Sequence, residues 1–204
     1  MHSPLNFWDQ RFAEPGYKYG TEPNAFLQAQ SPRLPKGAHI LLPGDGEGRN
    51  GVWLAQQGHH VTAVDSSPVG LQKAQSLARE RQTHIHTIEA DLADWTPPAY
   101  SADALVLVYL HLPPGIRHSA HQRLMQALRP GGWLIVEVFH PQQLQYNSGG
   151  PKDAAMLYTL DMLRQDFAGL KEVLAREEET QLSEGPGHQG QAFVTRWVAQ
   201  APSS

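Results

Sequence analysis

Short apolar runs alternate with helical patterns through the middle of the chain. Residues 39–42, 60–64, 84–89, 104–109 and 133–139 form five such runs, each short enough for a strand. The fourth, from Ala104 to Tyr109, is apolar throughout, as in a strand that helices cover on both faces. Helical patterns at 51–57, 68–81 and 115–128 lie between the runs. Strands and helices that alternate in this way predict an α/β domain with a parallel sheet and right-handed crossovers.

The last third of the chain changes its pattern. Residues 154–167 are expected to form a helix, and residues 170–179 and 192–199 two strands with alternating polarity. The segment 183–190 between these strands holds three glycines, too many for a helix. An antiparallel hairpin at the sheet edge is therefore predicted, which brings the sheet to seven mostly parallel strands with helices on both faces.

Charge and composition narrow the class of partner. The 204 residues carry 16 Lys and Arg against 20 Asp and Glu, a formal net charge of −4, and no basic run. This balance disfavours binding to nucleic acid or to an anionic membrane. No apolar stretch reaches the ~20 residues of a membrane span, and the first residues lack a secretory pattern, so a cytoplasmic protein is expected. The sequence has no cysteine, which excludes disulfides, thiolate metal sites and a cysteine nucleophile.

A glycine-rich turn follows the first predicted strand, at Gly44-Asp45-Gly46-Glu47-Gly48-Arg49-Asn50. Glycines between a strand and a helix let a ligand approach the backbone, because no Cβ stands in the way. The spacing Gly-x-Gly-x-Gly differs from the Gly-x-Gly-x-x-Gly of dinucleotide binders. Asp45 and Glu47 inside the turn are expected to repel a pyrophosphate and to suit a cationic or zwitterionic ligand.

Two further acids follow the next two strands. Asp65 ends the second strand, where an acid accepts hydrogen bonds from both hydroxyls of a ribose. Asp91 follows the third strand, so it belongs to the same edge of the sheet. Three consecutive loops thus offer glycines, a ribose acceptor and another acid without a phosphate clamp. They predict a site for a nucleoside that carries a zwitterionic tail, although both acids could also serve only as helix caps.

Together these segments resemble the class I S-adenosylmethionine-dependent methyltransferases. The likeness rests on Ile40–Asn50, Val61–Ser67, Ala90–Leu92 and Leu128–Gly132, and it covers nearly the whole chain. Small bacterial members similar to the tellurite-resistance and thiopurine methyltransferase group are the nearest in pattern. The resemblance implies a Rossmann-like fold, S-adenosyl-L-methionine as cofactor and S-adenosyl-L-homocysteine as product. It implies a methyltransferase domain over residues 31–204, preceded by a lid or cap segment over residues 1–30.

The resemblance also implies cofactor contacts. Asp65 would bind the ribose, Ser66 would lie against the adenosine, and Asp91 would meet the adenine amino group. The family usually has an acid where this chain has Leu42, so backbone carbonyls or Asp45 would have to receive the ammonium group. The complete expected set is Arg11, which could pair with the cofactor carboxylate, together with Gly44, Asp45, Gly46, Gly48, Asn50, Asp65, Ser66, Ala90, Asp91, Leu92, Val108 and Tyr109.

A small-molecule acceptor is expected for the methyl group. The fourth strand runs into Tyr109-Leu110-His111-Leu112-Pro113-Pro114, without the Asp/Asn-Pro-Pro-Tyr/Phe element of nucleic-acid amino methylases. Methyl transfer from a sulfonium is an in-line displacement that depends mainly on alignment and exclusion of water. A general base is optional when the acceptor is already an anion. A thiol or a chalcogen oxyanion would fit, and the oligomeric state is left open.

Four side chains near this edge are candidates for work on the acceptor. His111 follows the fourth strand, His140 the fifth, and His188 lies in the hairpin segment. Each could contact or deprotonate the acceptor, or bind an anion when protonated. Each could also be a loop histidine bonded to backbone, and a metal site is not expected. Tyr146, in the long polar segment after the fifth strand, is the fourth candidate.

Aromatic residues gather ahead of the sheet, between Phe7 and Tyr19. Such a segment could close over the site as a lid, with Trp8 and Tyr19 as walls, or simply pack on the sheet as an amphipathic helix. Two other functions stay open for the chain. It could sense S-adenosylmethionine without catalysis, or it could be a nicotinamide-dependent oxidoreductase on the same fold.

Overall fold

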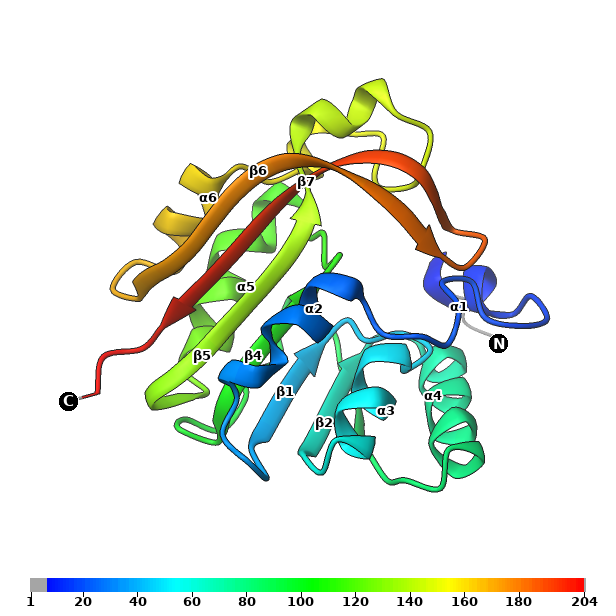
Figure 1. Cartoon of the computed structure of the whole chain (residues 1–204), viewed down its shortest axis with the longest axis horizontal. Coiled ribbons are helices and arrows are strands. Elements are labelled where there is room, and N and C mark those ends of the chain that lie inside the picture. The colour runs from blue at the N-terminus through cyan, green and yellow to red at the C-terminus, as the bar shows by residue number, and fades with distance from the viewer. Residues whose placement is uncertain (1–6, 204) are drawn as a thin grey trace.

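Within residues 7–203, which the computed structural model describes, the chain forms a seven-stranded sheet (Figure 1). The strands run in the order β3-β2-β1-β4-β5-β7-β6. β1 to β5 are parallel, and β7 lies antiparallel to both of its neighbours. The predicted architecture, with a C-terminal antiparallel hairpin, is thus confirmed. The bounds are β1 (His39–Pro43), β2 (His60–Asp65), β3 (His86–Glu89), β4 (Ala102–Val108), β5 (Leu128–Phe139), β6 (Lys171–Glu184) and β7 (His188–Gln200).

Helices cover both faces of the sheet. The α-helices are α1 (Phe7–Phe12), α2 (Ala25–Gln30), α3 (Arg49–Gln56), α4 (Pro68–Glu80), α5 (Pro114–Met125) and α6 (Leu160–Asp166). Three 3-10 turns lie at Ser31–Arg33, Pro141–Gln145 and Ala154–Met156. Apolar side chains of α2, α3 and α4 share one core cluster, and those of α5 and α6 share another.

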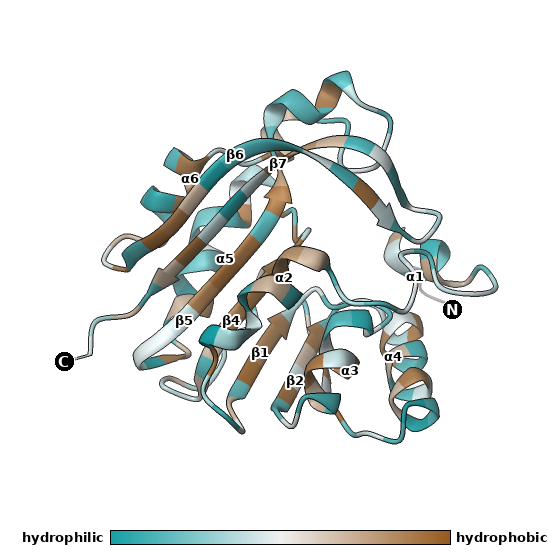
Figure 2. Cartoon of the chain, viewed as in Figure 1, coloured by the Kyte–Doolittle hydropathy of each residue, from teal (hydrophilic) through white to brown (hydrophobic). Residues whose placement is uncertain are grey.

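The central strands divide their side chains between these two cores. Ile40 and Leu42 of β1 belong to the cluster with α2, α3 and α4, whereas Leu41 belongs to the cluster with α5 and α6. Successive residues of a strand point to opposite faces, so a strand covered on both sides must be apolar at every position. Figure 2 shows this in the apolar colour of β1 and β4.

The chain between β5 and β6 differs from the single helix expected over 154–167. It forms a 3-10 turn and α6, with Tyr158 extended between them. The Tyr158 backbone N–H donates to the Phe139 carbonyl at 3.0 Å, and its buried hydroxyl accepts from the Leu112 N–H at 2.5 Å. Thr159 then caps α6 by accepting from the Met162 N–H. Tertiary bonds to the tyrosine therefore interrupt a helical pattern that the sequence presents as continuous.

Two strand boundaries also differ from expectation. β5 begins at Leu128 and runs through the Pro-Gly-Gly segment that was expected to form a turn, with a register shift against β4 between Ala102 and Ala104. β6 and β7 extend as far as Glu184 and His188, so residues 185–187 alone form the turn where a longer loop was expected. The hairpin consequently reaches toward the N-terminal segment (Figure 1).

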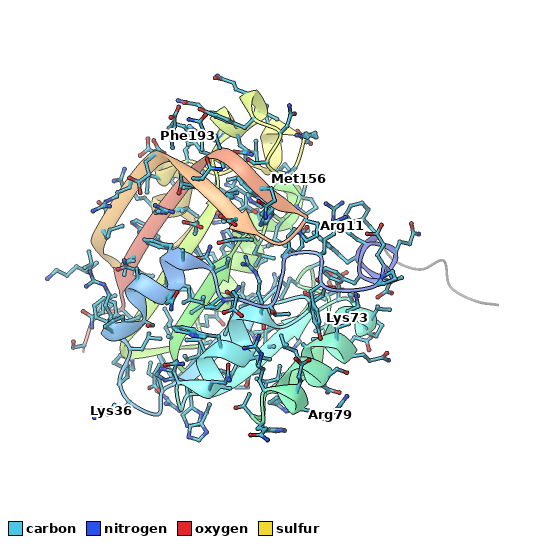
Figure 3. All side chains as sticks on the ribbon, turned by 45° about the vertical axis from the view of Figure 1, so that its right-hand side comes forward. Arg11, Lys36, Lys73, Arg79, Met156 and Phe193 are labelled. Carbon is cyan, nitrogen blue, oxygen red and sulfur yellow. The ribbon has the colours of Figure 1, made fainter. Side chains whose placement is uncertain are left out.

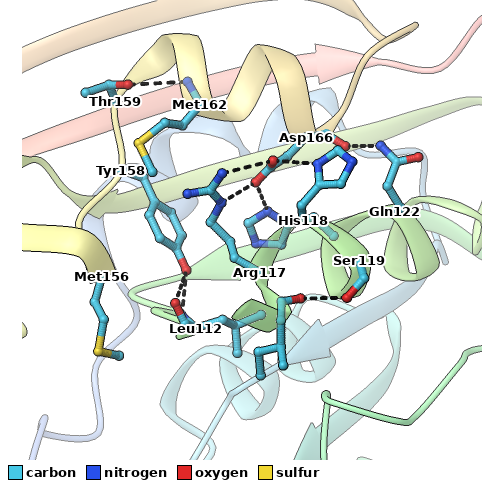
Figure 4. A network of polar contacts seen from close by, with 12 residues as sticks. Leu112, Arg117, His118, Ser119, Gln122, Met156, Tyr158, Thr159, Met162 and Asp166 are labelled. Atoms are coloured by element: carbon cyan, nitrogen blue, oxygen red, sulfur yellow. Dashed lines mark hydrogen bonds and ion pairs between the residues drawn. The ribbon is translucent and has the colours of Figure 1, made fainter. Parts of the chain in front are cut away.

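A buried carboxylate joins α5 to α6 (Figure 4). Asp166 accepts from Arg117 Nε at 2.7 Å and pairs with His118 Nδ1 at 2.9 Å and His121 Nδ1 at 2.8 Å. Burial alone would raise the pKa of Asp166, but the bonds from these three side chains outweigh it and hold the pKa well below its ordinary value. This cluster lies outside the glycine-loop region and fixes the helix pair on its face of the sheet.

No helix among residues 7–203 combines the length and the apolar character that a membrane crossing requires.

Gly48 is expected to tolerate a side chain much less well than Gly58. Both have φ near +90°, which costs a non-glycine residue about 1–2 kcal/mol. A Cβ on Gly48 would stand 2.7 Å from Cα of Ala74 in α4, whereas no described atom lies within 4 Å of a Cβ on Gly58. Overpacking should therefore add about 1–3 kcal/mol to the loss for Gly48→Ala alone. Urea unfolding of both variants measures the difference, and equal losses would contradict the close approach of loop and helix.

Candidate functional site

The glycine turn Gly44–Asn50 lies at the carboxyl end of β1, beside β4, where the strand order reverses. Ligands of open α/β sheets bind at this position. Gly44, Gly46 and Gly48 all have positive φ. A Cβ on Gly46 would stand 2.9 Å from the ring of Phe12, and one on Gly44 would stand 2.8 Å from Leu110. The turn therefore needs glycine both for its backbone conformation and for the side chains that approach it.

Asp65 ties the end of β2 to the glycine turn. Its Oδ2 accepts from the Gly46 N–H at 2.9 Å, and its Oδ1 accepts from the Ser67 N–H at 2.9 Å. Burial raises the pKa of Asp65, and the backbone donors oppose that rise. The Ser66 N–H is a third backbone donor to this carboxylate. A carboxylate has about four lone-pair sites, so three amide bonds leave it able to accept a further one. The acid predicted to bind a ribose is thus placed and oriented by the turn itself.

Asp45 points beneath the turn. Its Oδ2 accepts from the Gly51 N–H in the first turn of α3 at 3.1 Å, while its buried Oδ1 has no partner among the described residues. Burial raises the pKa of Asp45 to about 8, with the charge of Asp65 adding to the rise. The carboxyl therefore caps a helix and is largely neutral at pH 7.

Glu47 holds the N-terminal segment. Its Oε2 accepts from the Lys18 N–H at 2.7 Å, and its Oε1 pairs with Lys73 Nζ of α4 at 2.8 Å. The same ammonium group donates to the carbonyls of Glu14 and Gly16 at 2.8 and 2.7 Å. In Figure 3, Lys73 lies on α4 close to the N-terminal segment. We call residues 13–24 the strap. Since Asp45 and Glu47 are both engaged elsewhere, the repulsion of a pyrophosphate expected from the sequence does not describe this geometry.

Arg49 and Asn50 also face the strap and the hairpin. Asn50 Oδ1 accepts from the Asn24 N–H at 2.9 Å. Arg49 pairs with Glu184, near the hairpin turn, at 2.9 Å. The first turn of α3 therefore connects the glycine turn to both covering segments.

The segment after β3 lies at the same edge. The Ala90 N–H donates to the Asp65 carbonyl at 3.0 Å, which fixes this segment beside β2. Asp91 is exposed, and its Oδ1 accepts from the Ala93 N–H. Leu92 is buried in the cluster with α5 and α6, and Ser66 is exposed at the start of the α4 turn.

Aromatic rings gather at the carboxyl ends of β4 and β5. Tyr109 follows Val108 at the end of β4 with φ of +52°, a conformation rare for a tyrosine. Its ring lies 4.5 Å from the rings of Phe139 and His188, and His188 in turn lies 4.4 Å from the ring of Tyr19. Arg11 Nε donates to the Tyr19 hydroxyl at 3.2 Å. Segments far apart in the sequence thus build one aromatic wall.

His188 is the expected histidine that this wall contains. It is buried, and its Nδ1 lies 3.7 Å from Glu184 Oε2 without a hydrogen-bond partner among the described residues. Burial lowers the pKa of His188 despite the neighbouring carboxylate, which opposes the shift. The imidazole is therefore neutral at pH 7 and able to accept a proton.

His111 and His140 are engaged by backbone groups. His111 Nδ1 lies 2.6 Å from the Met156 carbonyl, and its Nε2 accepts from the Phe139 N–H at 3.1 Å, so both ring nitrogens are occupied. Burial lowers the pKa of His111 to about 4. His140 Nδ1 accepts from the Gln142 N–H at 3.1 Å and caps the 3-10 turn after β5. This geometry corresponds to the alternative of loop histidines bonded to backbone.

Tyr146 contacts the outer strand of the hairpin. Its hydroxyl donates to Glu179 Oε1 of β6 at 2.6 Å. This contact connects the segment after β5 to the outer strand of the sheet.

Glu137 is a buried charge that is not among the site residues expected from the sequence. It lies within β5, is 1% exposed, pairs with Arg196 of β7, and accepts from the Tyr109 hydroxyl at 2.7 Å. Asn24 Nδ2 also donates to it at 2.7 Å. A signal was present, because a single acid interrupts the apolar run 133–139 at a position that must be covered.

A cavity of about 460 Å³ lies at the opposite, amino edge of the sheet. Its lining includes His39, His59, His60, His84 and His86. Among residues 7–203, no group of three or more His, Cys, Asp or Glu side chains is arranged to hold a metal ion. The glycine turn and the acids that follow the strands are at the other edge, so the chemistry is placed there.

The neutral state of Asp45 predicts a pH-dependent effect of Asp45→Asn. A folded-state pKa of about 8, above the ordinary 3.8, means that the protonated acid favours folding at low pH and that this contribution is lost as pH rises toward 8. The loss begins near pH 3.8 and continues to about pH 8, so the unfolding free energy of the variant relative to the parent should be more than about 1 kcal/mol higher at pH 9 than at pH 5. Urea unfolding at both pH values measures this, with Asp94→Asn on the surface as control. A constant difference between pH 5 and pH 9 would contradict the shifted pKa.

Residues 40–132 match a family model described as a methyltransferase domain. The chain is 37% identical over 120 residues to trans-aconitate 2-methyltransferase of Rhizobium meliloti (strain 1021), which covers 58% of this chain and 44% of the relative. It is 28% identical over 125 residues to probable thiol methyltransferase 2 of Arabidopsis thaliana, which covers 58% and 52%. The chain thus spans about half the length of the curated relatives that it matches.

The fold is shared with solved methyltransferase structures. A SAM-dependent methyltransferase of Methanosarcina mazei superposes with a TM-score of 0.71 at 16% identity, over 90% of this chain and 100% of that one. The matched segment includes the glycine turn, Asp65 and the acid after β3. Residues 40–132 are thus similar in sequence to a methyltransferase domain, and the chain shares its fold with a solved methyltransferase, in agreement with the resemblance predicted from the motifs.

Proposed function

We propose that this protein transfers a methyl group from S-adenosylmethionine to a small-molecule acceptor, a thiol or a chalcogen oxyanion. The observation that carries the proposal is the carboxylate of Asp65, held by the Gly46 and Ser67 amides at the end of β2. Glycine turn and ribose acceptor form one unit, so a nucleoside bound by one is aligned with the other.

The residues at this edge fit such a cofactor. Asp65 retains acceptor capacity for the ribose, and the turn of three glycines presents backbone where side chains would obstruct a ligand. Ser66 and Asp91 are exposed at the same edge as Asp65, where the adenosine would lie. The residues proposed to hold the cofactor are Arg11, Gly44, Gly46, Gly48, Ser66, Asp65, Ala90, Asp91, Leu92, Val108 and Tyr109. Asp45, through its bond to α3, and Asn50, in the first turn of α3, would support the glycine turn.

The chemistry asked of the protein is alignment and exclusion of water. When bound, S-adenosylmethionine would supply a methyl group on a positively charged sulfur, from which the acceptor's lone pair would displace neutral S-adenosylhomocysteine. The strap and the aromatic wall would shield this displacement from solvent. For a thiol acceptor, the neutral imidazole of His188 could take up the proton that the thiol loses.

The charges near the wall support a soft, weakly charged acceptor. Glu137 is paired with Arg196, and Glu184 with Arg49, so the charged groups around His188 largely compensate one another. A polarisable sulfur or its heavier congeners would gain from the rings of Tyr19, Tyr109 and Phe139. The acceptors named for the relatives, trans-aconitate and a thiol, differ from each other, so the domain family leaves the acceptor class open.

A methyl-transfer assay separates this proposal from its alternatives. The protein is incubated with S-adenosylmethionine labelled in the methyl group and with a panel of thiols, selenite and tellurite. Labelled product supports the proposal. Tight binding without product for any acceptor would favour a sensor, and binding of NADH, detected by fluorescence transfer, would favour an oxidoreductase.

Asp65→Ala is expected to weaken binding of S-adenosylhomocysteine about tenfold or more, because it removes charge-assisted bonds to the ribose. Titration calorimetry at pH 7 measures the dissociation constant. Asp94 is an exposed acid after the third strand. The variant Asp94→Ala serves as the control and should bind like the parent. Unchanged affinity in a folded Asp65→Ala protein would overturn the proposed cofactor site.

His188→Gln is expected to lower turnover of a thiol about tenfold or more while leaving cofactor affinity nearly unchanged, since it removes the proton acceptor. The loss should shrink as pH rises toward the pKa of the thiol, because thiolate needs no base. His84→Gln, at the amino edge of the sheet, is the control. A loss of the same size at every pH would refute the role of His188 as base.

A further inference from the structure

A single side-chain amide joins two buried carboxylates behind the aromatic wall. Asn24 is fully buried at the end of the strap. Its Nδ2 donates to Glu137 Oε1 of β5 at 2.7 Å and to Glu184 Oε1, at the hairpin turn, at 3.0 Å. Since an amide nitrogen carries two hydrogens, both donors of Asn24 are used.

The other polar groups of Asn24 are engaged as well. Its Oδ1 accepts from the Leu27 N–H and caps α2, and its carbonyl accepts from the Gln28 N–H. Its own N–H donates to Asn50 Oδ1 in the first turn of α3. One residue therefore bonds to α2, α3, β5 and the hairpin turn.

Glu184 continues this connection to the glycine turn. Its Oε2 pairs with Arg49 at 2.9 Å and lies 3.7 Å from His188 Nδ1. Burial alone would raise the pKa of Glu184, but the neighbouring His188 and Arg49 outweigh it and the pKa lies below its ordinary value. The carboxylate is thus charged and depends on Asn24 and Arg49 for its bonds.

Direct contacts between strap and hairpin turn run parallel to this bridge. The Gly187 N–H donates to the Lys18 carbonyl at 2.8 Å, and the ring of Tyr19 lies against His188. A Cβ on Gly185 would overlap the Gly20 backbone. Strap and turn fit each other without space for displacement, so a shift of one must shift the other or break the polar bonds.

A buried carboxylate that loses a donor is costly, which makes the arrangement nearly all-or-none. Movement of the first turn of α3 acts on Asn24 through Asn50 and on Glu184 through Arg49. Both paths end at the hairpin turn that carries His188.

We propose that Asn24 is a positioning residue. It couples ligand binding at the glycine turn to the position of the hairpin turn 185–187 and of His188, which follows that turn. This inference rests on the proposed function, because it takes the glycine turn as the cofactor site. Asn24 is fully buried, and its amide nitrogen bonds to two carboxylates of the protein itself. It acts by holding Glu184, and through Glu184 the imidazole of His188.

Hydrogen exchange of the 185–190 amides, with and without saturating S-adenosylhomocysteine, tests the coupling. In the parent protein the ligand should slow exchange there about fivefold or more. Asn24→Ser keeps a helix-capping oxygen for α2 but removes both bonds to the carboxylates. The ligand should then slow exchange less than about twofold, and by reciprocity its dissociation constant should rise about fivefold.

Two further variants keep the test decisive. Glu184→Ala removes the acceptor at the other end of the bridge and should lose the same ligand-dependent protection, even if Asn24→Ser fails to fold. Gln28→Ala, a neighbour on α2 that takes no part in the bridge, should retain it. A merely structural Asn24 would lower thermal stability without changing the ligand-dependent protection, and that result would overturn the inference.

The outcomes distinguish this inference from the proposed function. If the parent protein binds no S-adenosylhomocysteine, the proposed cofactor site is wrong. If it binds the ligand but exchange at 185–190 does not respond, the site stands and the coupling is wrong.

Discussion

The hydrogen bond from the Gly46 amide to the Asp65 carboxylate is the interaction on which this site depends. It joins the turn after β1 to the end of β2 and so sets the distance between the two parts of a nucleoside site. Glycine is required at position 46 because the turn has positive φ there and because Phe12 occupies the space of a side chain. With Asp65 fixed, the rest of the edge is placed by parallel strands that end together.

Covering segments then rest on the same turn. Glu47 holds the strap through the Lys18 amide and Lys73, and Arg49 holds the hairpin turn through Glu184. Glu47 and Arg49 of the glycine turn thus secure the segments that cover it. This arrangement puts an aromatic wall beside the proposed cofactor position. The two carboxylates near the wall are both paired, Glu137 with Arg196 and Glu184 with Arg49.

The sheet could be predicted because its signal is local. A strand buried on both faces must be apolar at every position, and 104–109 satisfies that condition by itself. The break at Tyr158 could not be predicted, because bonds to Phe139 and Leu112, distant in sequence, override a helical pattern. The short hairpin turn depended likewise on strap contacts that no local pattern encodes.

The site residues also differ in how far the sequence could place them. Asp65 and the glycines could be placed from the sequence because strand ends fix where those backbones lie. The directions of Asp45 and Glu47 could not, because a rotation about Cβ decides between a ligand and a helix end. His111 and His188 look alike in the sequence, yet backbone groups saturate one ring and leave Nδ1 of the other without a bond within the described structure. Glu137 was identifiable only as an acid in an apolar strand.

A crystal structure with S-adenosylhomocysteine soaked or co-crystallised tests the central claim most directly. Density for the nucleoside is expected across the carboxyl ends of β1 and β2. Both ribose hydroxyls should lie within hydrogen-bond distance of Asp65, and the amino-acid end should lie over the glycine turn. Density for the ligand elsewhere, or an empty edge in crystals grown at saturating ligand, would contradict it.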